Sequence, residues 1–311
     1  MISIIIPSQD RPEPLTRCLR AIATAGVEDP GARFEVIVVN DGGAMALEPV
    51  VSAFRDRLHV VLLEQAHAGP AAARNAGAAL ARGQFLAFLD DDCVPAANWL
   101  QTLTARFAAA PTRAIGGRTL NGLPDNLYSC ASQLLADYLY EYFNPEPQQP
   151  SFFASNNLAL PREGFHVLGG FDSRFPSAAG EDRDLCDRWL RHGYQMTYAP
   201  EVLIYHAHTL TLRTFWKQHF NYGRGAFCFR RARAQRNNRR ISLEPLTFYL
   251  NLLCSPFSRA RRRRASLLAT LVLSQVANAM GFLWERRRFG RAHADSAART
   301  RTDTTGLDAG H

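Results

Sequence analysis

Short apolar runs alternate with helical stretches in the first part of the chain. The runs have the length of strands, are rich in Val, Ile, Leu and Phe, and are almost uninterrupted, which is typical of strands buried on both faces. They lie at 2–7, 34–41, 58–65 and 84–92. The stretches 12–26 and 69–83 open on or near proline and close on glycine, as helices commonly do. The alternation predicts an α/β fold with a mostly parallel sheet.

Polar residues follow three of these runs at the point where each ends. They are Pro7-Ser8-Gln9-Asp10, Asn40-Asp41-Gly42-Gly43 and Asp90-Asp91-Asp92. Because ligands of parallel sheets bind beyond the carboxyl ends of the strands, we expect the three segments to converge on one cleft.

Three adjacent carboxylates at the end of a buried strand are costly without a cation. Asp90 and Asp92 have a period-two spacing, which would point both side chains to the same side of an extended strand. Such a cluster can hold a divalent cation that bridges phosphate oxygens, although a solvated acidic loop is the alternative. The sequence has no G-x-G-x-x-G after its first strand, and its only lysine is Lys217. A dinucleotide site or a P-loop is therefore disfavoured.

The order of the motifs resembles family-2 glycosyltransferases with the GT-A type fold, over roughly residues 1–225. The segments that carry the resemblance are "ISIIIPSQDRPEPLTRCLRAI", "EVIVVNDGG", "GPAAARNAGAALARGQFLAFLDDDCVP", "FFASNNLALPREGFHVLGGFDSRF", "GEDRDLCDRWLRHGYQMTYAP" and "VLIYHAH". The resemblance implies the fold of a nucleotide-diphospho-sugar transferase, which is a mostly parallel sheet flanked by helices, in a bacterial enzyme of the hexosyltransferase type.

The resemblance also implies a set of donor-binding residues. Pro7 and Asp10 would line the nucleotide-sugar site. Asp41 would bind the base, since a carboxylate there can accept the imide hydrogen of uracil or the amide hydrogens of another base; a turn-capping role is the alternative. Arg74 would contribute to the donor pocket, unless it is a surface arginine of a helix. Asp91 would point away or share in donor binding.

For the metal, the resemblance implies Mn²⁺ or Mg²⁺ held by Asp92, while Asp90 faces the ribose. A late histidine, His206, would complete the metal or diphosphate site, and His208 could replace it if the strand ran further.

The acidic pair Glu181-Asp182 follows Gly180 and precedes apolar residues at helical spacing, which predicts a helix with carboxylates at its N-terminus. Capping of the helix is the simple interpretation. By resemblance Asp182 is the general base, with Glu181 as the alternative, because inverting transfer needs one carboxylate to deprotonate the acceptor hydroxyl. Asn156 and Asn157 would line the acceptor side of the cleft.

Charge divides the chain into two unequal parts. Residues 1–212 hold 16 arginines against 23 acidic residues, a formal charge of −7, whereas residues 213–311 carry +15. Such asymmetry suggests that the basic part meets an anionic surface. We therefore divide the chain into a catalytic domain at 1–212, a basic and apolar helical region at 213–291 and a disordered tail at 292–311.

Within the basic part, residues 243–257 are apolar but too short to span a membrane, and residues 266–284 form a 19-residue stretch without a charge. Arginines flank both. This pattern favours monotopic or re-entrant helices on anionic lipid, and a soluble hairpin packed on the catalytic domain is the alternative. A nucleic-acid partner is disfavoured, because no recognition motif accompanies the arginines.

The six cysteines lack metal-type or disulfide-dense spacing, and the first residues lack a basic region, so we expect reduced thiols and no signal peptide. The location expected is the cytoplasmic face of the inner membrane, peripheral or monotopic, or otherwise the cytoplasm.

The sequence thus predicts an inverting glycosyltransferase that moves a sugar from a UDP- or other nucleoside-diphosphate sugar to a glycan or lipid-linked hydroxyl, in cell-surface glycan or glycolipid synthesis. The alternatives are a nucleotidyltransferase and a non-catalytic, membrane-bound sugar-nucleotide-binding protein.

Overall fold

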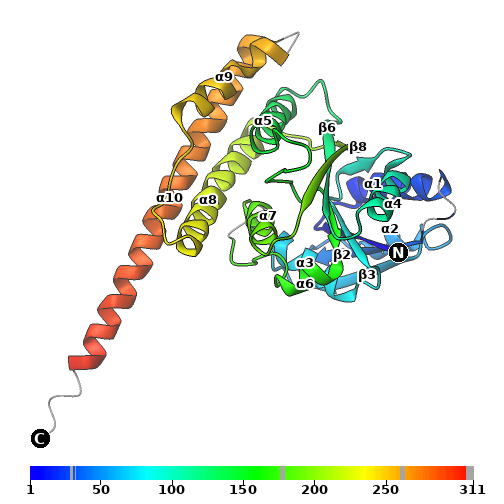
Figure 1. Ribbon diagram of the computed structural model, residues 1–311, viewed down its shortest axis with the longest axis horizontal. Helices are drawn as coiled ribbons and strands as arrows, with labels where there is room; N and C mark the ends of the chain where they lie inside the picture. Colours follow the sequence, from blue (N-terminus) through cyan, green and yellow to red (C-terminus); the bar gives the residue numbers. More distant parts are fainter. Residues whose placement is uncertain (29–30, 32, 176–178, 260–262, 306–311) are drawn as a thin grey trace, which may run out of the picture.

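The computed structural model describes the chain apart from residues 29–30, 32, 176–178, 260–262 and 306–311, and describes side chains as far as Arg291. A sheet covered by helices forms the first part, and a group of long helices lies beside it and extends away (Figure 1).

An eight-stranded mixed sheet forms the centre, in the order β3-β2-β1-β4-β7-β6-β8-β5. Its first four strands in the chain are parallel, which confirms the predicted α/β fold and mostly parallel sheet. They are β1 (Ile2–Ser8), β2 (Phe34–Asp41), β3 (Val60–Gln65) and β4 (Phe85–Leu89). The carboxyl ends of these strands therefore share one edge, as the polar segments that follow them predicted.

The other strands extend the sheet beyond β4. Antiparallel β7 pairs with β4 and β6, β6 pairs in parallel with β8, and the short β5 pairs antiparallel with β8. Their bounds are β5 (Cys93–Pro95), β6 (Ala114–Asn121), β7 (Asn157–Pro161) and β8 (Met196–His206). Cys93 and Asn121 both pair with His206, so the end of β8 lies next to the residues that follow β4.

Two hydrophobic cores cover the two faces of the sheet. One is built on α1 (Pro12–Glu28), α2 (Glu48–Ser52) and α4 (Trp99–Ala109). The other is built on α3 (Pro70–Leu80), α6 (Arg162–Val167) and α7 (Glu181–Arg191). The buried apolar runs found in the sequence supply the residues of β1 to β4 in both cores, and the later strands supply the rest.

The C-terminal part consists of α8 (Leu212–Arg236), α9 (Leu246–Arg259) and α10 (Arg264–Thr305), which pack together with α5 (Leu127–Phe143). The sequence predicts a disordered tail from residue 292, whereas the helix α10 continues through Thr305. Alanine and arginine, which recur in 292–301, have high helix propensity, and this accounts for the continuation. Residues 306–311 of that tail lie outside the described residues.

Glycines allow α8 and α10 to approach until their backbones nearly touch. A Cβ atom on Gly223 would lie 1.9 Å from the carbonyl oxygen of Asn278, and one on Gly281 would lie 1.9 Å from that of Phe220. Arg224 and Glu285 form an ion pair of 2.7 Å (Nε to Oε2) across the same interface. These contacts fix α10 along α8.

The opposite side of α8 packs on the helix that carries the acidic pair. A Cβ atom on Gly225 would lie 2.0 Å from the carbonyl oxygen of Ala179, just before α7. Arg236 also forms ion pairs with Asp184 and Asp187 of α7. The helix α8 therefore packs against the catalytic part and against α10, so the boundary drawn at 212 falls between elements in close contact.

We predict that Gly281→Ala lowers the free energy of unfolding by about 1–3 kcal/mol, because its methyl group would overlap the backbone of α8. Gly290→Ala is the control, since nothing lies within 4 Å of a Cβ atom there. Ala favours a helix over Gly by roughly 1 kcal/mol, so the control should be neutral or stabilising. Denaturant unfolding followed by circular dichroism measures both. Equal changes in the free energy of unfolding for Gly281→Ala and Gly290→Ala would contradict the close packing of α8 and α10.

Candidate active site

The aspartates that follow β4 lie at the carboxyl edge of the sheet, as the sequence predicts. Asp91 and Asp92 are buried, whereas Asp90 is partly exposed. Arg11, at the start of α1, pairs through Nη1 with Asp91 Oδ1 at 2.8 Å and through Nη2 with Asp92 Oδ2 at 2.5 Å. Ser8 at the end of β1 donates a hydrogen bond of 2.7 Å to Asp91. Two strand ends and one helix start thus meet at these carboxylates.

Burial of the carboxylates shifts their ionisation. Burial raises the pKa of Asp91 to about 7, with Asp92 and Asp90 adding to the rise and Arg11 and Ser8 opposing it. For Asp92, burial also favours the neutral form, but the positive charges of His206 and then Arg11 outweigh it and lower the pKa below its usual range. The cluster is therefore short of positive charge at Asp91, while Asp92 stays ionised.

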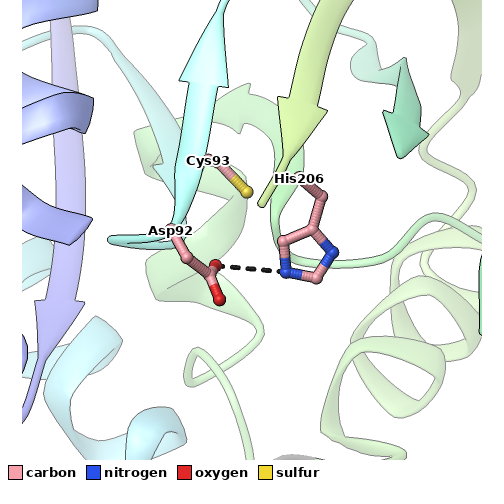
Figure 2. A group of neighbouring side chains, drawn as sticks. All are labelled: Asp92, Cys93 and His206. Atoms are coloured by element: carbon pink, nitrogen blue, oxygen red, sulfur yellow. Dashed lines mark ion pairs between the residues drawn. The ribbon is translucent and has the colours of Figure 1, made fainter. Parts of the chain in front are cut away.

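His206 at the end of β8 faces Asp92, with Nε2 at 3.1 Å from Oδ1 (Figure 2). Despite this proximity, Asp92 Oδ1 is buried without a well-formed hydrogen bond from any described residue. A buried, ionised oxygen with free acceptor capacity next to a histidine nitrogen fits a divalent cation. In turn, Asp92 raises the pKa of His206, although burial of the histidine opposes the rise.

Cys93 completes a group with Asp92 and His206 in which the possible ligand atoms all lie within 4.8 Å of one another (Figure 2). The sequence analysis did not single out this cysteine. Burial raises the pKa of its thiol well above the ordinary value, and the neighbouring aspartates add to the rise. A hard cation such as Mn²⁺ or Mg²⁺ prefers oxygen ligands, which favours Asp92, and a protonated thiol is a poor metal ligand, which leaves the imidazole of His206 as the second candidate. His208 packs beside His206, with ring centroids 5.3 Å apart, and it is His206 that faces the Asp92 carboxylate.

Arg74 of α3 is buried and joins the two acidic segments of the site. Its Nη2 lies 2.6 Å from Asp90 Oδ1 and its Nη1 lies 3.2 Å from Glu181 Oε1. The guanidinium also packs over the ring of Phe171. The side chain is therefore part of the site, and the alternative of a surface arginine does not hold. It fixes the N-terminus of α7 next to the end of β4.

The acidic pair at the start of α7 divides into a buried and an accessible residue. Glu181 is 2% exposed and faces Arg74, whereas Asp182 is partly exposed. Burial raises the pKa of Asp182, and the backbone amide of Arg183, which donates a hydrogen bond of 2.7 Å to Oδ1, opposes the rise. Burial also raises the pKa of Glu181, to about 8, so the direction of the shift does not separate the two residues. Arg74 holds Glu181, and this contact favours Asp182 for proton abstraction.

Asp41 is buried, and both of its oxygens already accept hydrogen bonds. Oδ1 accepts from Gln65 Nε2 and from the backbone amide of Ala68, and Oδ2 accepts from the amide of Gly69. His67 Nδ1 lies 2.9 Å from Oδ2. Asp41 therefore holds the loop before α3, which is the capping role that the sequence left open. A base would have to share this carboxylate with the loop.

The two asparagines before β7 have different environments. Asn157 is buried and fully bonded, since it donates to the carbonyls of Arg118 and Val202 and accepts from Trp99 Nε1. This set of bonds ties three strands and α4 together, which corrects the expectation that Asn157 lines the cleft. Asn156 is partly exposed, and its Oδ1 has no hydrogen bond from the described residues. Asn156 is thus the better acceptor-side candidate.

The remaining predicted residues lie in the β1–α1 segment. Pro7 is the penultimate residue of β1, and Asp10 adopts a left-handed conformation with φ of 55°. Asp10 Oδ1 accepts a hydrogen bond of 2.7 Å from the amide of Met45. Arg11 was not predicted as a site residue. Its position as the first basic residue after the first strand is the signal that could have pointed to it.

Comparisons with known proteins agree with this geometry. The model of the family "Glycosyl transferase family 2" matches residues 3–169. A validoxylamine A glucosyltransferase from Streptomyces hygroscopicus subsp. jinggangensis is 30% identical in an alignment of 231 positions that covers 65% of this chain and 54% of that protein. A pre-mycofactocin glycosyltransferase from Mycobacterium tuberculosis is 30% identical in an alignment of 232 positions that covers 72% of this chain and 46% of that protein. The chain thus spans about half the length of the curated relatives it matches.

A solved structure gives the same fold. The mannosyltransferase from Pyrobaculum calidifontis in complex with GDP-Man and Mn²⁺ superposes with a TM-score of 0.61 at 18% identity, covering 91% of this chain and 87% of that one. S. aureus TarS 1-349 superposes with a TM-score of 0.52 at 15% identity, covering 94% and 91%. Likeness at such low identity shows the fold alone, and the sequence match over more than half of the chain shows the family. This chain belongs to glycosyltransferase family 2 and has the GT-A type fold.

Proposed function

We propose that the chain is an inverting, metal-dependent glycosyltransferase that moves a sugar from a nucleoside-diphosphate sugar to a hydroxyl acceptor. The Arg74 bridge is the observation that supports this most, because it holds the aspartates after β4 next to the accessible carboxylate of Asp182. A leaving-group site and a base then share one cleft. GDP-Man with Mn²⁺ in the mannosyltransferase structure, and UDP-GlcNAc in the TarS structure, support a donor of this class.

In this proposal Asp182 accepts the proton of the acceptor hydroxyl as the hydroxyl oxygen attacks the anomeric carbon. The new carbon–oxygen bond forms as the bond to the diphosphate breaks, and the nucleoside diphosphate leaves with the electron pair. A single displacement of this kind inverts the anomeric configuration and needs one base. Asp92 and His206 would hold the divalent cation, which when bound offsets the negative charge of the leaving diphosphate.

The other residues bind and orient. Arg74 keeps Asp90 in place for the ribose, and Asp41 with the loop it holds lies where the base would bind, next to the end of β2. Pro7, Asp10 and Asp91 belong to the same donor side of the cleft, while Asn156 lies on the acceptor side. Burial of Glu181 against Arg74 gives it a positioning role for the base.

The two rivals have less support. A nucleotidyltransferase would place a glycine- and lysine-bearing loop after the first strand, but β1 runs into Gln9, Asp10 and Arg11 instead. A non-catalytic sugar-nucleotide-binding protein has no use for a partly exposed carboxylate of raised pKa next to the donor side.

We predict that Asp92→Ala abolishes the divalent dependence of nucleoside-diphosphate binding, because the cation loses its ionised ligand. Calorimetric titration of UDP and GDP, with and without Mn²⁺, measures the effect. Asp56→Ala is the control, since Asp56 is an exposed aspartate before the amino end of β3, whereas the site lies at the carboxyl ends of the parallel strands. Unchanged metal dependence in Asp92→Ala would show that another residue holds the cation.

We predict that Asp182→Asn lowers turnover by about 10²–10⁴-fold with donor binding nearly intact, because the amide cannot accept the proton. The raised pKa adds a pH dependence. A base with a raised pKa becomes protonated at a higher pH than the ordinary value of about 4, so wild-type turnover should fall as the pH drops through that raised pKa. A pH–rate profile measures this limb, which should be missing from the residual activity of Asp182→Asn. A loss confined to donor affinity would argue against the base.

We further propose that the C-terminal helices dock the protein on anionic lipid, so that it meets a membrane-bound acceptor at the cytoplasmic face. One helix segment, Arg264–Arg291, is long enough to cross a membrane and contains an 18-residue stretch with a mean hydropathy of 1.5. One face of it is buried against α8, α5 and α9, at Leu267, Leu271, Ala277 and Gly281 among others. A helix held in this way favours contact with lipid through its other face over complete insertion.

The other face of α10 is apolar and exposed along three turns. Its residues are Val272, Val276, Met280, Leu283 and Trp284, and the arginines 286–288 follow directly. The helix α9 exposes Leu246, Leu250 and Phe257 as well. Apolar side chains bordered by arginines suit the interface of an anionic membrane, where each arginine contributes about 1 kcal/mol that salt screens.

We predict that the double substitution Val276→Asp and Leu283→Asp abolishes cosedimentation with vesicles that contain anionic lipid, while high salt releases the wild type only in part. Val167→Asp at the end of α6 is the matched control, since Val167 is an exposed valine away from α10. Wild-type protein that ignores anionic vesicles would favour a soluble hairpin and a soluble acceptor.

A further inference from the structure

Arg11 covers the buried aspartates from the solvent side. Its side chain is 40% exposed, whereas those of Asp91 and Asp92 are 3% exposed each. The two terminal nitrogens are divided between the two carboxylates, at 2.8 Å and 2.5 Å. Part of the positive charge at the cluster therefore comes from a side chain that borders the solvent.

The turn that carries Arg11 is built to aim it at the carboxylates. Asp10 adopts a left-handed conformation, which is unfavourable for a residue other than glycine, and its side chain is held by the amide of Met45. Gly43 packs directly on this turn, because a Cβ atom there would lie 2.7 Å from Asp10 Oδ1 and 2.9 Å from Asp10 N. The carbonyl of Arg11 accepts the first helical hydrogen bond of α1, from Leu15. The loops after β1 and β2 thus anchor the backbone of Arg11, whereas its side chain reaches the solvent.

We propose that Arg11 is an internal counter-ion that occupies the metal carboxylates before the donor arrives and passes to the donor's diphosphate when cation and donor bind. This inference rests on the proposed function. A divalent cation on Asp92 would place two positive charges beside the guanidinium, and such charges repel each other strongly in a partly buried site. The displaced guanidinium then needs a new anion, and a diphosphate offers one that matches its paired N–H donors.

Arg11 in this role makes the binding of cation and donor depend on each other. The cation alone has to displace Arg11 and leave it without a partner. The cation together with a nucleoside diphosphate displaces it onto the phosphates, so each ligand strengthens the binding of the other, and by linkage the effect is reciprocal. The benefit to the enzyme is that the metal site fills when a donor is present.

The test is the affinity for Mn²⁺ alone, measured by calorimetry on the wild type and on Arg11→Gln. Removal of the competing charge should tighten Mn²⁺ binding by roughly threefold to a hundredfold, the range of couplings found between charged groups of one network. The ratio of Mn²⁺ affinities with and without saturating UDP or GDP should shrink in Arg11→Gln. The control is Arg55→Gln, which removes a surface arginine paired with Glu48 at 2.6 Å and should change neither value.

A readout of folding accompanies the titration, because removal of Arg11 leaves the carboxylates without their counter-ion. Without metal, Arg11→Gln should unfold at a lower temperature than the wild type. Addition of Mn²⁺ should raise the unfolding temperature of Arg11→Gln by more than it raises that of the wild type. If Arg11→Gln does not fold, Arg11→Lys gives the test, since a single ammonium cannot pair with both carboxylates as the fork does, and Mn²⁺ binding should again tighten.

Two outcomes would overturn the inference in different ways. Unchanged or weaker Mn²⁺ binding in the variants, with nucleotide coupling as in the wild type, would remove the role of Arg11 and leave the proposed function intact. Absence of Mn²⁺ binding to the wild type, with or without UDP or GDP, would remove the metal site of the proposed function and the inference with it.

Discussion

The buried guanidinium of Arg74 is the contact on which the arrangement of the site depends. It extends from α3 to the end of β4 and to the first residue of α7, so that Asp90 and Glu181, which are 91 positions apart, share one cation. A buried ion pair of this kind is weak support for stability, because desolvation offsets much of the attraction. Its effect is on geometry: the N-terminus of α7, and with it Asp182, is held next to the aspartates. Removal of either partner would leave an uncompensated buried charge.

The remaining electrostatics of the cleft follow from a surplus of carboxylates at one sheet edge. Desolvation raises the pKa of Asp91 to about 7. Cations from three different elements pair with the three aspartates: Arg11 from the start of α1 with Asp91 and Asp92, Arg74 from α3 with Asp90, and His206 from the end of β8 with Asp92. Each cation has a distinct place. Arg74 is enclosed, His206 borders the oxygen of Asp92 that has free acceptor capacity, and Arg11 is the most exposed of the three. This division is what permits a fixed framework and an exchangeable charge in the same cluster.

The C-terminal helices are joined to the catalytic part through α8. Gly225 lets the helix approach the backbone before α7, and Gly223, on another side of the same helix, lets α10 approach equally closely. Because both contacts are between backbones, α10 is held in a defined position relative to α7. The exposed apolar face of α10 then has a fixed orientation relative to α7, which is the arrangement that transfer to an acceptor at a surface would need.

The sequence by itself determined the sheet and its edge. Uninterrupted apolar runs of strand length indicate strands buried on both faces, and the polar residues that follow parallel strands meet at one edge of the sheet. Its resemblance to family-2 glycosyltransferases also pointed to Asp90 to Asp92, Asp182 and His206 as residues of one site, and their roles stay predictions. Only the tertiary structure decided which partner each side chain has. Periodicity fixes the face of an element and says nothing of contacts between distant segments. For that reason Arg11 was missed, Asn157 was assigned to the cleft although its bonds lie inside the sheet, and Asp41 was left between two roles. The same reason applies to the basic part: its composition predicted apolar helices bordered by arginine, and the packing of Gly223 and Gly281 determined which face remained exposed.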